Sequence, residues 1–167
     1  PTMQERFGLA AAVVAGTPMY LGVARLVGME ALGATNEIAK DVASMAGKWD
    51  KYDFFFLHYK HTDKAGEDGD YQAKVRCIEE ADAAIPAIEA LAPDVLIITA
   101  DHSTPSAMKG HSWHPVPTLL WSKTARREGA LKFCEDTCRR GYLGLRPSVH
   151  LMPLALAHAG RLAKFGA

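Results

Sequence analysis

Apolar residues in this chain gather in short uninterrupted runs. Four such runs, bounded by glycine, proline or polar residues, have the length and content typical of buried strands. They span residues 9–15, 52–59, 95–99 and 117–121. The run Val95-Leu-Ile-Ile is the clearest of them, because three of its four residues are β-branched and it follows the break at Pro93-Asp94.

Between the runs, apolar residues recur at helical spacing. The longest such segment is residues 71–91, where Val75, Ile78, Ile85 and Ile88 share one face and Asp70 is suited to be the N-cap. Further helices are predicted at residues 20–28 (opened by Pro18), 36–47, 130–141 and 153–164. The polar, glycine-containing segment 60–70 is predicted to be a loop.

Strands that alternate with helices favour a mostly parallel sheet with helices on both faces, which is an α/β fold. No internal repeat, low-complexity tract or linker divides the chain, so we expect one α/β layer domain over residues 1–167.

Composition narrows the classes of function. The 19 basic residues balance 19 acidic ones, which leaves no electrostatic footprint for nucleic acid or for an acidic membrane surface. The apolar stretch near the N-terminus is too short and interrupted to span a bilayer and lacks the features of a signal peptide. Three scattered cysteines do not suggest a disulfide framework, so we expect a reducing, cytoplasmic setting.

Candidate metal ligands gather in three loops that we expect at one edge of the sheet. Asp63 and Glu67 follow the second predicted strand, Asp101 and His102 follow the third, and His111 precedes the fourth. Ligands in open α/β sheets bind beyond the carboxyl ends of the strands. Carboxylates with imidazoles and no thiolate are typical of Zn²⁺ or Mn²⁺ sites, and two such ions can clamp a phosphoryl group.

The same loops carry a family resemblance. Asp101-His-Ser-Thr-Pro at the end of an apolar strand, followed by His111-x-x-x-Pro-Val-Pro, resembles the metal-binding segment of the archaeal-type cofactor-independent phosphoglycerate mutases, which belong to the alkaline phosphatase superfamily. Lys60-x-Thr-Asp63-x-Ala-Gly-x-x-Gly-Asp70 resembles the family's other metal loop. The likeness extends to residues 20–30 and 141–167 and so covers nearly the whole chain.

The resemblance implies an alkaline-phosphatase-like α/β/α sandwich and two divalent metal ions (Mn, Zn, Mg or Co), with no organic cofactor. Asp63, the residue at position 67 and His111 would bind one ion, and Asp101 with His102 would bind the other. A serine would carry a phosphoryl group between the hydroxyls of 3- and 2-phosphoglycerate. The family usually has histidine at position 67; Glu67 is expected to favour Mn²⁺ or Mg²⁺, or else to mark a weakened site.

A second departure concerns the nucleophile. Only eight residues precede Leu9, where the family places its serine loop and an inserted domain, so no catalytic residue is assigned and the serine is expected upstream of Pro1. We therefore expect residues 1–167 to be the C-terminal part of a metalloenzyme, inactive alone, with an exposed strand edge or apolar area through which the fragment self-associates.

Alternatives remain within and beyond this reading. The parent could be phosphonopyruvate decarboxylase-like or another phosphatase or phosphomutase of the superfamily, and the chain could be a non-catalytic metal-binding module. Lys60 could contact phosphate or be a solvated loop lysine. His61 and His114 are expected beside the ligands or exposed, rather than among the ligands. Ser103 and Thr104 are expected to orient groups or to form backbone bonds, and Cys134 with Cys138 are expected to be core residues rather than a metal pair.

Overall fold

The computed structural model describes residues 1–35, 37–126, 129 and 132–162. In the N-terminal part the elements are α1 (Met3–Phe7), β1 (Ala11–Val14), α2 (Pro18–Leu26), β2 (Glu30–Ala31), α3 (Ile38–Ala46), the 3₁₀ turn η1 (Trp49–Lys51) and β3 (Phe54–Leu57). They are followed by α4 (His61–Glu67), α5 (Tyr71–Glu89), β4 (Val95–Ile98), β5 (Leu119–Ser122), α6 (Glu135–Cys138), the 3₁₀ turn η2 (Ser148–His150) and α7 (Leu151–His158).

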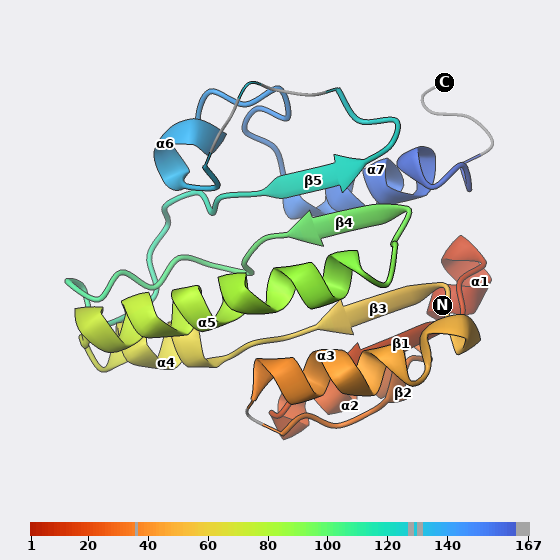
Figure 1. The fold of residues 1–167 in the computed structure, drawn as a ribbon, viewed down its shortest axis with the longest axis horizontal. Coiled ribbons are helices and arrows are strands. Elements are labelled where there is room, and N and C mark those ends of the chain that lie inside the picture. Colours follow the sequence, from red (N-terminus) through yellow and green to blue (C-terminus); the bar gives the residue numbers. More distant parts are fainter. Residues whose placement is uncertain (36, 127–128, 130–131, 163–167) are drawn as a thin grey trace.

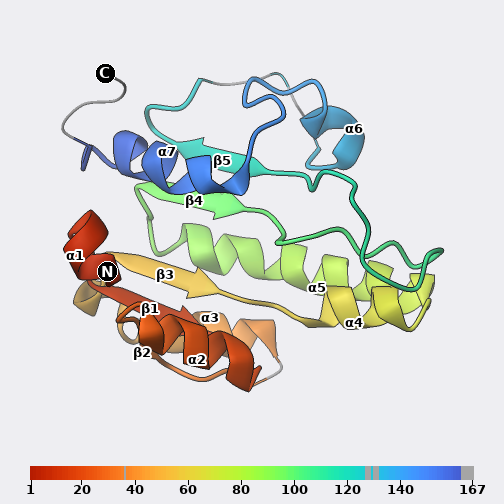
Figure 2. The same cartoon turned by 180° about the vertical axis from the view of Figure 1, so that it is seen from behind.

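The strands form two sheets. Three parallel strands are ordered β2-β1-β3, with Ala12 opposite Phe55 and Val13 opposite Phe56, whereas β4 and β5 pair antiparallel. Helices α3 and α5 lie on one side of the strands, and α2 and α7 lie on the other (Figures 1 and 2). The α/β class and the predicted strands are thus confirmed, while the direction of β5 departs from a wholly parallel sheet.

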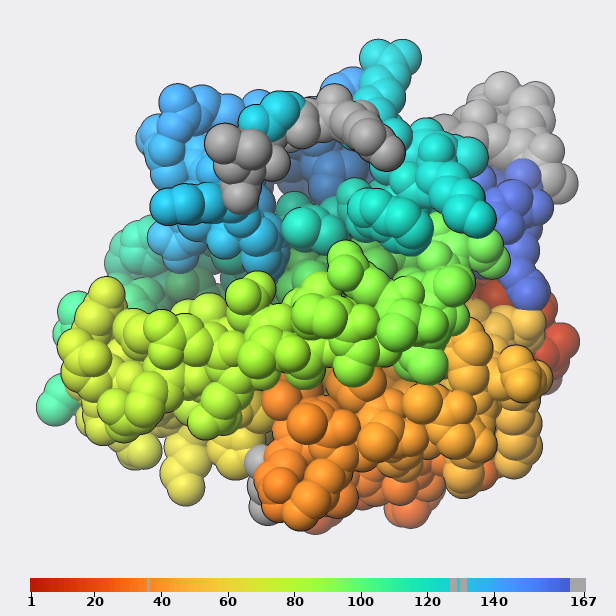
Figure 3. All heavy atoms as spheres, in the orientation of Figure 1, coloured from red at the N-terminus to blue at the C-terminus, as the bar shows by residue number. Residues whose placement is uncertain are grey.

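Two buried clusters form the core. Val13, Ala15 and Ala24 pack between β1 and α2, with Tyr20 and Leu21 against them. Val42, Ala84 and Ile88 pack between α3 and α5, and this second cluster is joined by partly buried residues of β3 and β4, namely Leu57 and Leu96. In the space-filling view of Figure 3, α5 runs along much of the visible face with α3 beside it.

The largest correction concerns the segment after β3. The polar residues and two glycines of residues 60–70 predict a loop, yet His61–Glu67 form α4. Ala65 and Gly66 are buried there, so tertiary packing outweighs the weak helix propensity of glycine. The N-cap prediction at Asp70 is confirmed, because its carboxylate accepts a hydrogen bond of 2.8 Å from the Ala73 amide.

Other differences concern element ends. Of the helix predicted at 130–141, the described residues are helical only in α6. Positions 130–131 lie outside the described residues. The helix predicted at 153–164 ends at His158 before Gly160, whose φ of 68° ends the helical conformation, and positions 163–164 lie outside the described residues. Asn36, where another helix was predicted to begin, also lies outside them. Cys134 is exposed, so its expected place in the core is wrong.

The sequence patterns missed the short helix α1, which has too few residues to show a period. Its Thr2 side chain accepts from the Glu5 amide while the Glu5 carboxylate accepts from the Thr2 amide, a capping box. Among the described helices, none is long and apolar enough to cross a membrane.

Candidate metal centre

Helix α4 presents two carboxylates to one place. Asp63 and Glu67 are four residues apart and therefore lie on the same helix face. The helix can approach the segment after β4 only because Gly66 has no side chain: a Cβ there would collide with the Thr104 carbonyl oxygen. Gly66 thus sets how close the carboxylates come to the two histidines of the next segment.

Antiparallel pairing beyond β4 and β5 brings His102 and His111 together. Ser103 and Ser112 form an isolated bridge in which the Ser112 amide donates to the Ser103 carbonyl at 2.9 Å. The two histidines precede the bridged serines, and their rings lie 3.7 Å apart between centroids with an interplanar angle of 31°. Because β5 runs opposite to β4, the segment before β5 starts at the edge where β4 ends.

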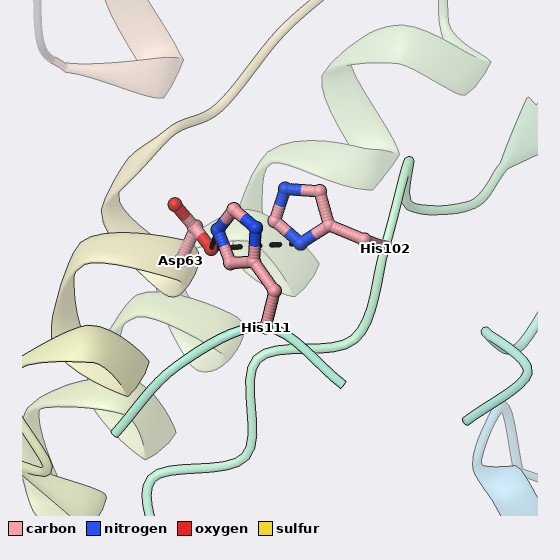
Figure 4. A group of neighbouring side chains, drawn as sticks. All are labelled: Asp63, His102 and His111. Atoms are coloured by element: carbon pink, nitrogen blue, oxygen red, sulfur yellow. Dashed lines mark ion pairs between the residues drawn. The ribbon is translucent and has the colours of Figure 1, made fainter. Parts of the chain in front are cut away.

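The ligand atoms of Asp63, His102 and His111 all lie within 4.8 Å of one another (Figure 4). The His111 Nε2 atom is 3.6 Å from an Asp63 Oδ1 atom and 3.5 Å from the Glu67 Oε1 atom. Two donors bound to one ion at about 2.1 Å lie roughly 3–3.5 Å apart in tetrahedral or octahedral geometry. The distances from His111 to Asp63 and to Glu67 are therefore close to those between two ligands of one divalent cation.

Thr104 connects this group to His102. Its hydroxyl, on a residue that is 4% exposed, donates to Asp63 Oδ1 and lies 3.1 Å from His102 Nδ1. Since that hydroxyl proton is given to the carboxylate, the oxygen accepts from His102 Nδ1–H, which leaves the Nε2 atom of His102 as the lone-pair donor. That Nε2 atom is 3.5 Å from Asp101 Oδ2, so Asp101 and His102 form a second donor pair.

Neighbouring groups keep the Asp63 carboxyl group ionised. Burial acts to raise the pKa of this carboxyl group, but hydrogen bonds from Lys60 and Thr104 and the Lys60 charge outweigh it, and the pKa is lowered. The Lys60 ammonium contacts Asp63 Oδ2, and this bond raises the pKa of the lysine. Asp63 is accordingly an ionised carboxylate and Lys60 a cation directly beside the cluster.

The other residues considered as possible ligands or helpers lie outside the donor cluster or contact it in other ways. The His114 Nδ1 atom lies 2.8 Å from the Ser112 hydroxyl oxygen, and the His61 ring lies 5.0 Å from that of Tyr59, so neither belongs to the donor cluster. Asp68 is the C-cap residue of α4. Thr104 bonds to His102 and Asp63 through its hydroxyl, and Ser103 bonds to Ser112 through its backbone, which are the two kinds of contact expected for these residues.

Sequence reasoning did not single out His58. This residue directly follows β3 and precedes Tyr59 and Lys60, and its ring lies 4.0 Å from that of Tyr20. Its buried Nδ1 atom has no hydrogen-bond partner among the described residues, and burial lowers the pKa of the imidazole. The sequence signal that could have identified His58 is its position between the end of a predicted strand and the segment that contains Asp63.

Comparisons with known proteins identify the family of this chain. Residues 1–158 match the model of the Metalloenzyme superfamily. The chain is 50% identical over 167 residues to a protein of Thermotoga sp. (strain RQ2) named "Probable 2,3-bisphosphoglycerate-independent phosphoglycerate mutase", and 49% identical over 170 residues to a protein of the same name from Thermus thermophilus. All of this chain is covered in both matches, but it spans only 42% of the length of each relative.

Two solved structures share the fold. A Pyrococcus horikoshii protein matches 99% of this chain with a TM-score of 0.92 and 34% identity, over 53% of its own length. The cofactor-independent phosphoglycerate mutase from Thermoplasma acidophilum matches 96% of this chain with a TM-score of 0.72, over 39% of its length; at 21% identity this match shows the fold alone. With the family model matching nearly its whole length, the chain belongs to the metalloenzyme superfamily.

Proposed function

We propose that this chain is the metal-binding C-terminal part of a 2,3-bisphosphoglycerate-independent phosphoglycerate mutase. In the parent protein, a serine outside residues 1–167 would take the phosphoryl group from 3-phosphoglycerate and return it to give 2-phosphoglycerate. The observation that carries the proposal is the convergence of Asp63, His102 and His111, which come from separate segments of the chain, within 4.8 Å. The names of relatives that are half identical to this chain support the reaction.

The five donors would divide between two divalent ions. Asp63, Glu67 and His111 would hold one, and Asp101 with His102 would hold the other, together with groups from the rest of the parent. Bound divalent ions supply charge stabilisation for the oxygens of a phosphoryl group in transfer. The chain's own part is to fix the donors: Thr104 orients His102 toward Asp101 while it holds the Asp63 carboxylate.

Glu67 is proposed to favour hard cations. The Glu67 Oε1 atom stands 3.5 Å from His111 Nε2, at the spacing of two ligands of one ion. With Asp63, it gives the first ion two carboxylates and one imidazole, a set that suits Mn²⁺ or Mg²⁺ better than a set with a second imidazole would.

Lys60 is proposed to contact the substrate phosphate. Its side chain is 40% exposed, and its ammonium contacts the Oδ2 atom of Asp63 rather than lying in bulk water. When a cation occupies the cluster, repulsion disfavours this ion pair, so the flexible lysine can turn toward an incoming phosphate as a point charge.

The ligand assignment is tested by calorimetric titration of the chain with Mn²⁺ and with Zn²⁺. Asp63→Asn should weaken binding at least tenfold, because it removes the carboxylate shared by the cluster. Asp68→Asn, an exposed neighbour at the end of the same helix, is the matched control and should bind as the unaltered chain does. Equal affinities for all three proteins would contradict the assignment.

The reaction itself is tested on the parent protein. Conversion of 3-phosphoglycerate, with no decarboxylation of phosphonopyruvate and slow hydrolysis of a simple phosphate ester, is the expected result, and Asp63→Asn should abolish it. Turnover of phosphonopyruvate or fast ester hydrolysis would favour the alternative reactions of the superfamily. Conversion at a normal enzyme rate by residues 1–167 alone would refute the placement of the nucleophile outside this chain.

A further inference from the structure

Lys74 on α5 contacts the residue that joins the two parts of the donor cluster. Its ammonium group donates to the Thr104 carbonyl oxygen at 2.5 Å, across a sequence separation of 30. The hydroxyl of the same threonine donates to Asp63 Oδ1 and lies 3.1 Å from His102 Nδ1. The backbone of Thr104 is thus held from α5, while its side chain bonds to one donor of each proposed ion.

The start of α5 and the small size of Gly66 make this contact possible. Asp70 caps α5 through the Ala73 amide, which fixes the place of Lys74 in the first turns of the helix. A Cβ at Gly66 would stand 3.1 Å from the Lys74 Nζ atom and 2.3 Å from the Thr104 carbonyl oxygen. The bond between Lys74 and Thr104 therefore occupies the space beside Gly66, between α4, α5 and the segment after β4.

The positive charge of Lys74 does not explain its place beside a cation site. The side chain is partly buried, and its acceptor is a neutral carbonyl. Among the described residues no carboxylate forms an ion pair with Lys74, although Asp63 and Glu67 lie on the neighbouring helix. A positive charge near a metal site opposes cation binding by Coulomb repulsion. Any contribution of Lys74 to metal binding must therefore come through the group to which it is bonded.

We propose that Lys74 is a positioning residue of the metal centre and that it acts through Thr104. The bond to the carbonyl oxygen fixes the Thr104 backbone, so that the hydroxyl stays between Asp63 and His102. Groups bonded to metal ligands set the direction of the ligand lone pairs, and their loss lowers metal affinity. The inference rests on the proposed function, because it takes Asp63 and His102 to be metal ligands.

Titration of the parent protein with Mn²⁺ tests the inference by the sign of the effect. Lys74→Met should weaken Mn²⁺ binding at least ~3-fold, because the Thr104 hydroxyl loses its fixed position. The matched control is Lys64→Met, which removes the same charge from an exposed position on α4 and should leave binding equal or tighter. Equal or tighter binding by Lys74→Met would overturn the proposal, since loss of the charge alone predicts that result.

A double-mutant cycle tests the route through Thr104. Thr104→Val removes the hydroxyl and nearly keeps the shape of the side chain, and it should weaken Mn²⁺ binding roughly tenfold. In that background Lys74→Met should change the affinity less than about twofold, because the group that Lys74 positions is already absent. Losses that add in the double variant would overturn the proposed route.

Two conservative variants of Lys74 guard against a general effect on folding. Lys74→Arg keeps a cationic donor of similar reach and should bind Mn²⁺ nearly as the unaltered protein does. Lys74→Gln stays polar, but its amide nitrogen is one atom closer to the backbone than the lysine nitrogen and falls short of the Thr104 carbonyl. It should show the same loss as Lys74→Met and replaces that variant if the methionine prevents folding. Full affinity in Lys74→Gln would overturn the proposal.

A measurement without metal reports the positioning directly. Nitrogen NMR of the His102 imidazole should show the proton on Nδ1 in the unaltered parent protein, because the Thr104 hydroxyl oxygen accepts it. In Lys74→Met the population with the proton on Nε2 should rise. An unchanged tautomer in Lys74→Met would count against the proposal, because the hydroxyl would then be held without the lysine.

Asp63→Asn separates this inference from the metal assignment itself. If this variant binds Mn²⁺ as the unaltered protein does, the assignment of the ligands is wrong and the inference falls with it. If Asp63→Asn weakens binding whereas Lys74→Met does not, the assignment stands and only the role of Lys74 is wrong.

Discussion

Strands β1 and β4 are both four residues long and wholly apolar, yet their surroundings differ. Every residue of β1 is between 0 and 4% exposed, whereas every residue of β4 is partly exposed, although Val95-Leu-Ile-Ile98 is the more hydrophobic sequence. Among the described residues, β1 has a paired strand on each side and α2 against one face, whereas β4 has one paired strand. The difference shows that burial follows from the number of neighbours rather than from hydrophobicity alone.

The largest effect is expected from placing a charge in the better-buried strand. Val14→Asp should lower the free energy of unfolding by several kcal/mol, on the order of 3–5, because the Val14 side chain is 0% exposed and a carboxylate there would lose its hydration. Ile97→Asp in β4 should cost less than half as much, since its side chain keeps contact with water. Urea unfolding followed by circular dichroism measures both, and equal losses would contradict the comparison.

Two helical glycines also differ in how closely other atoms surround them. Gly66→Ala should lower the free energy of unfolding by roughly 1–3 kcal/mol and weaken metal binding, because the added methyl would collide with the Thr104 carbonyl. Gly22→Ala in α2 meets nothing within 4 Å and should raise stability by about 0.5–1 kcal/mol. Thermal unfolding and Mn²⁺ titration read out both variants; stabilisation by Gly66→Ala would show that α4 can move away without cost.

Helix caps give a smaller difference. Asp70→Ala removes the carboxylate that accepts from the Ala73 amide and should cost about 1 kcal/mol, because the 19-residue helix α5 contributes Ala84 and Ile88 to the buried core. Thr2→Ala breaks the capping box of α1, a helix of five residues none of which is fully buried, and should cost only a few tenths of a kcal/mol. Chemical unfolding measures the loss of stability in each variant. A larger loss for Thr2→Ala than for Asp70→Ala would contradict this prediction.

The smallest effect concerns the Cys134 thiol, which precedes α6. Its pKa is lowered by a hydrogen bond with the Thr137 hydroxyl, 3.3 Å away. Because the thiolate is the reactive form, alkylation by iodoacetamide should reach its maximal rate at lower pH than in Thr137→Val, where the pKa returns toward that of an ordinary thiol. Mass spectrometry of the labelled peptide gives the rate, and identical pH profiles would exclude this role for Thr137.

Local patterns in the sequence account for most elements. Proline at the first turn located α2, the period of Val75, Ile78 and Ile88 located α5, and Asp70 fixed where α5 begins. The candidate donors were also identifiable, because Asp63, Asp101, His102 and His111 follow or precede apolar runs. The helical state of residues 61–67 was not, since it depends on Gly66 packing against a segment nearly forty residues further along the chain.

By itself, the sequence determined the class of fold, the order of its elements and the chemistry of the donors, because these follow from side-chain type and local period. Only the tertiary structure decided that β5 runs against β4, that Thr104 joins Asp63 to His102, and that β3 and β4 remain in separate sheets. These features depend on contacts between residues distant in the chain. Such contacts form where burial and hydrogen bonding outweigh the entropy of closing long loops, a balance that no local pattern encodes.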